Sequence, residues 1–196
     1  MSTGAGPRWA RLASELLAPW VLAAVMPVLV SALTTRPAWR GALLGLVVTT
    51  TCAAVPYAVV AVGVRRGRYE SHHVRRREDR PPLLALVAGL TVLTAVLLVA
   101  LGATATSLTY LGLMTACVGV GLVVSRFWKI SLHCLVLTAS VVVLTGLRPW
   151  AFPVLATVAW VGAARVRLGA HTPAQVAAGT VAGAVLAGAA LVLAPA

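Results

Sequence analysis

The feature that most constrains the fold is a series of apolar runs separated by short arginine-containing segments. A membrane-spanning helix needs about 20 mainly apolar residues. Only 10% of this chain is charged and 60% is hydrophobic, whereas soluble domains carry roughly 25% charged residues. We therefore expect an all-α, multi-pass transmembrane helical bundle of six or seven spans, forming one integral-membrane domain over residues 1–196. The expected spans are Leu16–Thr34, Gly41–Val64, Pro82–Leu101, Ser107–Val124, Leu132–Leu147, Trp150–Ala164 and Pro173–Leu193.

The connections between these spans alternate in charge. After the second, fourth and sixth spans come "RRGRYESHHVRRREDRP", "SRFWK" and "RVRLGAH", whereas "TRPAWR", "GATAT" and "RP" follow the others. If the N-terminus lies with the first group, 13 of the 16 Lys and Arg residues fall on one side. The positive-inside bias makes that side cytoplasmic, in the cell membrane. Because the charges cluster beside apolar runs, we expect membrane lipids as partners and no nucleic acid.

Two of the basic connections end in similar helix starts. In "FWKISLHC", Ser131 is placed to cap a helix, with Lys129 before it and His133 in the first turn. In "ARVRLGAHTPAQ", Thr172 and Gln175 have the spacing of a capping box, and His171 comes just before the helix. Helix N-termini favour anions. These two segments therefore predict an anion pocket that contains two histidines.

Each of these residues also has a purely structural explanation. Lys129 can extend to the headgroups, and His133 can be an interfacial residue without a chemical role. Gln175 can serve only to cap its own helix. The arginines of Arg65–Arg80 are expected mainly as a topology signal, and Gly179 with Gly183 as a site of close helix packing.

Two imidazoles among several guanidinium groups suit phosphoryl transfer without a metal. One histidine would attack phosphorus, the other would protonate the leaving oxygen, and the cations would stabilise the phosphoryl oxygens. All four acidic residues lie outside the expected spans, and the sequence has neither HExxH nor a Cys/His ligand pair. We therefore expect no metal and no other cofactor.

The second helix start resembles the third motif of the type 2 phosphatidic acid phosphatase superfamily, SRxxxxxHxxxD. Arg165 and His171 match the arginine and the nucleophilic histidine of that motif. Ala164 replaces the serine, and Gln175 replaces the aspartate. Glutamine at this place is also found in the dolichyl-diphosphatase and glucose-6-phosphatase branches.

The second motif of that family, PSGH, is similar to Ile130-Ser131-Leu132-His133. The resemblance implies that Ser131 binds phosphate and that His133 is the general acid, with Lys129 as a further phosphate ligand. Proline and glycine of the motif are absent from this chain.

The first motif, KxxxxxxRP, matches only in its Arg80-Pro81, and His73 stands at the lysine position. Arg76 and Arg77 are alternative cations. The resemblance therefore implies phosphate-binding roles for Arg80, Arg77 and His73, and it covers residues 65 to 185.

The resemblance implies a membrane lipid phosphatase that hydrolyses a lipid phosphate or a prenyl diphosphate. His171 would form a phosphohistidine, and Gln175 would orient its ring. One alternative is a non-catalytic relative that binds or moves an anionic lipid. Another is an enzyme that transfers or eliminates the diphosphate of a prenyl substrate.

Overall fold

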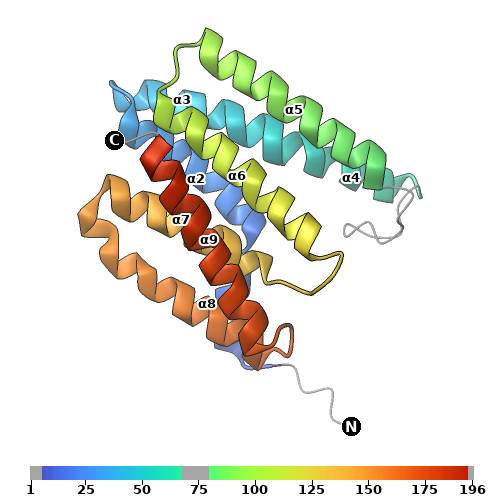
Figure 1. Ribbon diagram of the computed structural model, residues 1–196. Coiled ribbons are helices and arrows are strands. Elements are labelled where there is room, and N and C mark those ends of the chain that lie inside the picture. The colour runs from blue at the N-terminus through green and yellow to red at the C-terminus, as the bar shows by residue number, and fades with distance from the viewer. Residues whose placement is uncertain (1–5, 68–79, 194–196) are drawn as a thin grey trace. The chain divides into compact units, whose positions relative to one another are not determined.

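The computed structural model describes residues 6–67 and 80–193, and all regular structure in these ranges is helical (Figure 1). The expected all-α class is therefore confirmed for the described residues. The helices are α1 (Arg8–Leu16), α2 (Pro19–Thr34), α3 (Ala38–Thr49), π-helix η1 (Thr50–Ala54), α4 (Val55–Arg65), α5 (Arg80–Ala100), α6 (Ala105–Val124), α7 (Leu132–Leu147), 3₁₀-helix η2 (Pro149–Leu155), α8 (Ala156–Arg167) and α9 (Pro173–Leu193).

Several of these helices have the length and composition of membrane spans. Within the described residues, four are long and apolar enough to cross a bilayer, and the broken pair of α1 and α2 would make a fifth. The apolar part of α5, Ala85–Ala100, and helix α7 are shorter. The chain is thus a helical membrane protein by composition, but the helix lengths do not confirm six or seven spans. The four segments are Ala38–Arg65, Ala105–Val124, Pro149–Arg167 and Pro173–Leu193.

The chain divides into two compact units, with the boundaries inside α2 and α6. One unit is Ala23–Leu111, and the other joins Met1–Leu22 to Gly112–Ala196. Each unit is described below by itself.

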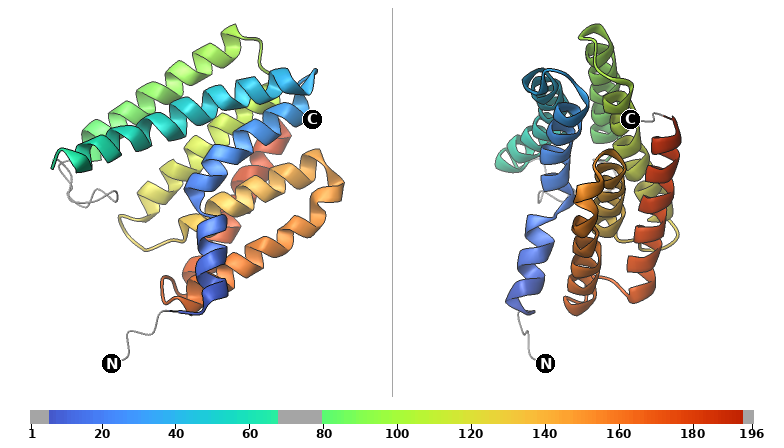
Figure 2. Two further views of the ribbon diagram at one scale, coloured as in Figure 1. Left: turned by 180° about the vertical axis from the view of Figure 1, so that it is seen from behind. Right: turned by 90° about the vertical axis from the view of Figure 1, so that its left-hand side faces the viewer.

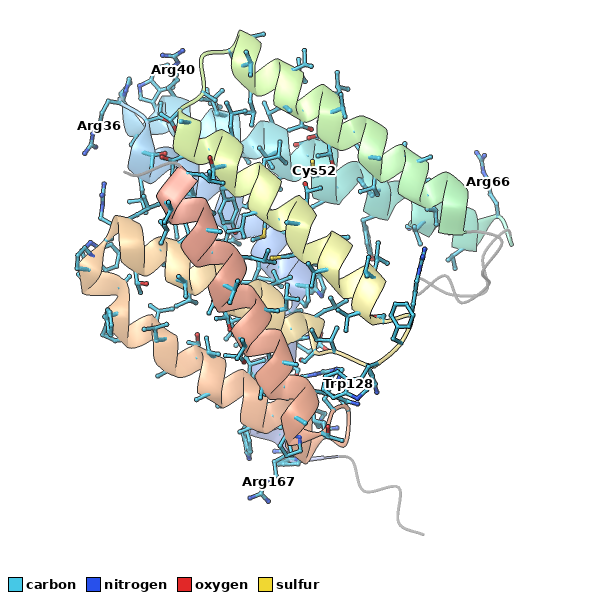
Figure 3. All side chains as sticks on the ribbon, viewed as in Figure 1. Arg36, Arg40, Cys52, Arg66, Trp128 and Arg167 are labelled. Atoms are coloured by element: carbon cyan, nitrogen blue, oxygen red, sulfur yellow. The ribbon has the colours of Figure 1, made fainter. Side chains whose placement is uncertain are left out.

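The unit Ala23–Leu111 contains a continuous helix from Ala38 to Arg65 that widens into the π-helix at its centre. Pro56 follows this turn and has no N–H to donate, which explains why the regular bonding pattern is interrupted there. The hydroxyl of Thr51 lies 2.6 Å from that of Thr94 on α5 and so pairs polar groups inside the unit. Figure 3 labels Arg40 at one end of this unit and Arg66 at the other.

In the other unit, α7 forms the core and packs most extensively against α9 (Figure 1). The contact depends on small residues. A β-carbon added to Gly179 would lie 2.5 Å from the carbonyl oxygen of Ser131, and one added to Gly183 would collide with the carbonyl of Leu135. Glycine therefore allows the two backbones to approach closely, as the sequence predicts.

Helix α1 precedes the expected first span, Leu16–Thr34, most of which is helix α2. It ends at Leu16, and α2 begins at Pro19, a residue suited to the first turn of a new helix. Ala10 and Ala13 on α1 are fully buried, and the helix packs on α8, as Figure 2 shows. Its opposite surface leaves Trp9, Leu12 and Leu16 exposed. The sequence analysis does not predict this short amphipathic helix or its packing on α8.

Candidate functional site

The start of α7 has the capped geometry that the sequence predicts. The hydroxyl of Ser131 accepts a hydrogen bond from the N–H of Cys134 at 3.4 Å. Ser131 is fully buried, and His133 is half-buried in the first turn of the helix. The cap fixes the direction in which α7 leaves the loop, and with it the position of His133.

The connection from α8 to α9 is short, and hydrogen bonds cap the helix at each of its ends. Gly169 has φ +64°, and the amides of Gly169 and Ala170 donate to the carbonyls of Val166 and Arg165 at 2.9 Å and 3.0 Å. This is the Schellman arrangement that commonly ends a helix. At the other end, the predicted capping box is present. The Thr172 amide donates to Oε1 of Gln175 at 3.1 Å, and the Gln175 amide donates to Oγ1 of Thr172 at 3.3 Å.

Two hydrogen bonds join this connection to the start of α7. Nζ of Lys129 donates to the carbonyl of Ala170 at 2.7 Å, and the amide of Ser131 donates to the carbonyl of Gln175 at 3.3 Å. Segments about forty residues apart in the sequence therefore meet at one end of this unit. Figure 3 labels Trp128 and Arg167 at this end.

The hydrogen bonds of Gln175 determine the tautomer of His171. Oε1 of Gln175 accepts from the Thr172 amide, and Nδ1 of His171 lies 3.3 Å from the same oxygen. The carbonyl oxygen of an amide side chain can only accept hydrogen bonds, so Nδ1 must carry the proton and donate it. In the neutral ring, Nε2 then holds the lone pair. This nitrogen is available as a nucleophile.

His133 lies within electrostatic range of both Arg165 and His171, and its ring is hydrogen-bonded to the backbone of Ser14 on α1. A ring N–H that donates to a carbonyl fixes the orientation of an imidazole. Helix α1 thus contributes to the position of His133, although it lies far from the motifs in sequence.

Arg165 is within electrostatic range of both His133 and His171 and has an unused donor. Its Nε is buried and, among the described residues, finds no hydrogen-bond partner. Glu15 at the exposed end of α1 is within electrostatic range of Arg165. It is the only acidic residue in the described part of the chain. Buried polar groups in proteins are nearly always hydrogen-bonded, so Nε of Arg165 is an exception, as are the hydroxyls of Ser14, Thr35 and Thr138.

Burial lowers the pKa of His171 below its ordinary value of 6.5. The positive charges of Arg165 and Lys129 lower this pKa further, whereas the hydrogen bond to Gln175 raises it. Burial, the two cations and the hydrogen bond all act on His171 because the starts of α7 and α9 meet here. At neutral pH the ring is uncharged, which is the form that can attack an electrophile.

Three of the predicted phosphate ligands are not among the residues that the structure brings together around His133, Arg165 and His171. His73 and Arg77 lie outside the described residues. Arg80 is the first residue of α5, but its side chain is also outside what the structure describes, and it belongs to the other unit. Their predicted roles stay predictions.

Two neighbours of the site, Ser14 and Glu15, were missed by sequence reasoning. The signal that could have located them is the spacing of Ala10, Ala13 and Ser14, which places three small residues on one face of a short helix. Such a face predicts close helix packing, but it does not indicate which helix is the partner.

The described residues contain no group of three or more His, Cys, Asp or Glu side chains placed to share a metal ion. Comparisons with protein-family models, with curated proteins and with solved structures give no match for the chain. The assignment of a function therefore depends on the geometry of the site itself.

Proposed function

We propose that the protein is a membrane phosphatase that hydrolyses a lipid phosphate or a prenyl diphosphate without a metal ion. The observation that carries the proposal is the meeting of Arg165 with two imidazoles, those of His133 and His171, where the starts of α7 and α9 are joined. A phosphoryl group supplies acceptor oxygens for a guanidinium, and it is also the group on which a nucleophilic and an acidic imidazole can act. The resemblance to the type 2 phosphatidic acid phosphatases supports the same chemistry.

In the first step, Nε2 of His171 attacks phosphorus and the bond to the leaving oxygen breaks. The negative charge of the bound substrate favours the protonated form of His133, which transfers its proton to that oxygen, so the lipid leaves as an alcohol or as a monophosphate. In the second step, neutral His133 takes a proton from water, and the resulting hydroxide attacks the phosphohistidine. The P–N bond breaks, inorganic phosphate is released, and both histidines return to their initial forms.

The remaining residues stabilise charge and geometry. Arg165 and Lys129 attract the phosphoryl oxygens, and the capped start of α7 at Ser131 supplies backbone amides. Gln175 holds the tautomer of His171 but, being neutral, adds no charge to stabilise an imidazolium.

We also propose that the chain crosses the cell membrane six or seven times, with the site at the cytoplasmic face. The positive charge of the connections that carry the site residues supports this orientation.

The test is phosphate release by detergent-purified protein from a prenyl diphosphate and from phosphatidate, in the presence of EDTA. We expect His171→Ala to reduce the rate to that of the reaction without protein. His133→Ala should lose activity on lipid substrates but keep much of it on p-nitrophenyl phosphate, because that leaving group needs no proton. His72→Ala, at a histidine without a proposed role, is the matched control and should remain active.

Full activity of His171→Ala would exclude the phosphohistidine mechanism. Vanadate binding that requires Arg165, together with no turnover of any substrate, would instead identify a protein that binds or moves an anionic lipid. A product whose carbon skeleton has changed would indicate transfer or elimination.

A further inference from the structure

Helix α1 presents three different stripes of side chains, because residues three, four or seven apart lie on the same face of a helix. Small residues form a buried stripe, large apolar residues form an exposed stripe, and charged residues form a second exposed stripe. In this order the stripes are Ala10, Ala13 and Ser14; Trp9, Leu12 and Leu16; and Arg8, Arg11 and Glu15. Because exposed apolar surface is costly in water, a helix with neighbouring apolar and cationic stripes fits a boundary between lipid and water.

The start of α1 lies at the end of a helix that is able to cross a bilayer. A β-carbon added to Gly6, two residues before α1, would lie 2.6 Å from Cδ2 of Leu168, the residue that follows α8. The segment Pro149–Arg167, which ends with α8, is long and apolar enough to span a membrane. The ends of spanning helices lie at the level of the lipid headgroups. Arg8 and Arg11, in the first turn of α1, are therefore placed near that level.

A second segment at this end of the unit carries exposed aromatic residues. In the connection that leads to α7, Phe127 is 87% exposed and Trp128 is 45% exposed. Helix α1 lies beside the start of α7, because the ring of His133 is hydrogen-bonded to the backbone of Ser14. Tryptophan is enriched where membrane proteins meet the lipid headgroups. Two segments that are far apart in the sequence thus have an interfacial composition at one end of this unit.

From these observations we propose that α1 is a surface helix that binds an anionic lipid membrane. The apolar stripe lies against the acyl chains, and Arg8 and Arg11 attract the phosphates of the headgroups. Glu15 shares the charged stripe, but the two arginines outnumber it, so the stripe has a net positive charge. The interaction is independent of the proposed function, because it needs a lipid surface and no turnover.

The first experiment measures the surroundings of α1 in the full-length protein. A nitroxide spin label is attached at Leu12→Cys, Leu16→Cys or Arg11→Cys, all exposed positions. The protein is then reconstituted in vesicles of phosphatidylcholine with phosphatidylglycerol. We expect the first two labels to collide mainly with oxygen, which dissolves in lipid, and the third mainly with a water-soluble nickel chelate. The native cysteines are buried or half-buried, so the labelled wild type measures the background.

The second experiment measures the contribution of the arginines with the label at Leu12→Cys. Vesicles of phosphatidylcholine alone are compared with vesicles that also contain phosphatidylglycerol. The label should lie deeper in the anionic vesicles, and high salt should reduce the difference. In the variant Arg8→Gln with Arg11→Gln the difference should be lost. The matched control, Arg36→Gln with Arg40→Gln, removes the same charge from the other unit and should keep the difference.

The other outcomes would overturn the proposal in distinct ways. Water contact at all three labels would place α1 off the membrane, and lipid contact at all three would make it part of a span with α2. Inaccessibility to both reagents would mean that protein, such as a second copy of this chain, covers the apolar stripe. Equal depth in both kinds of vesicle would contradict binding to anionic headgroups. Because Leu12 and Leu16 lie on the same stripe, either label provides the test if the other variant does not fold.

Discussion

At the residue scale, the informative group is the side-chain oxygen of Gln175. It accepts from the backbone of Thr172 and from the ring of His171, so one atom caps a helix and selects a tautomer. The capping role was predictable from the spacing of Thr172 and Gln175. The tautomer was not, because it depends on a distance between two rotamers. The structural explanation of Gln175 and the functional one are therefore compatible.

Lys129 gives a prediction about pH dependence. Its positive charge is one of the causes that lower the pKa of His171, so Lys129→Met should raise this pKa. As the pH falls, the ring is then protonated at a higher pH than in the wild type. The acidic limb of the pH profile of kcat/KM therefore moves to higher pH. NMR titration of the His171 ring should show the same shift without substrate.

The control for this prediction is Arg126→Met, at an exposed cation in the same connection. An acidic limb that stays in place in Lys129→Met, while KM rises, would mean that Lys129 acts only as a phosphate ligand.

At the element scale, the caps of α7 and α9 and the existence of the helices were predictable, because local propensity and hydrophobicity determine them. The separate helix α1 was not. It is nine residues long, and its stability comes from packing Ala10 and Ala13 on α8, a contact distant in sequence. Local patterns do not indicate the partner in such a contact, so Ser14 and Glu15 were missed.

The α7–α9 contact gives a prediction about stability. Gly183→Leu forces a side chain against the backbone of α7, and overpacking of this kind typically costs about 1–3 kcal/mol. We expect a lower Tm in detergent. A β-carbon added to Gly188 on the same helix meets no atom within 4 Å, so Gly188→Leu should leave Tm unchanged or higher, because leucine is the better helix former. Equal losses in both variants would contradict the packing argument.

At the scale of the whole molecule, the sequence predicts a membrane protein with one strongly basic side. The long apolar helices agree with a membrane protein. The number of spans was less predictable, because apolar length alone does not separate a crossing helix from one buried among others, such as α7. Eleven residues of α7 are buried, so protein, in place of lipid, surrounds much of it.

Orientation can be tested with single cysteines. Ser125→Cys, in the connection before α7, should react with a membrane-impermeant maleimide only from the cytoplasmic side. Trp39→Cys, at the start of α3, should react only from the opposite side. The native cysteines are buried or half-buried, so the wild-type chain measures the background. Reaction of both variants from the same side would contradict the proposed topology.

Glu15 has a consequence for anion binding. Because its carboxylate is within electrostatic range of Arg165, the resting pocket is already partly neutralised. An anion that enters beside Arg165 meets this negative charge as well as the positive charge of the guanidinium, so α1 weakens the attraction of the site for every anion.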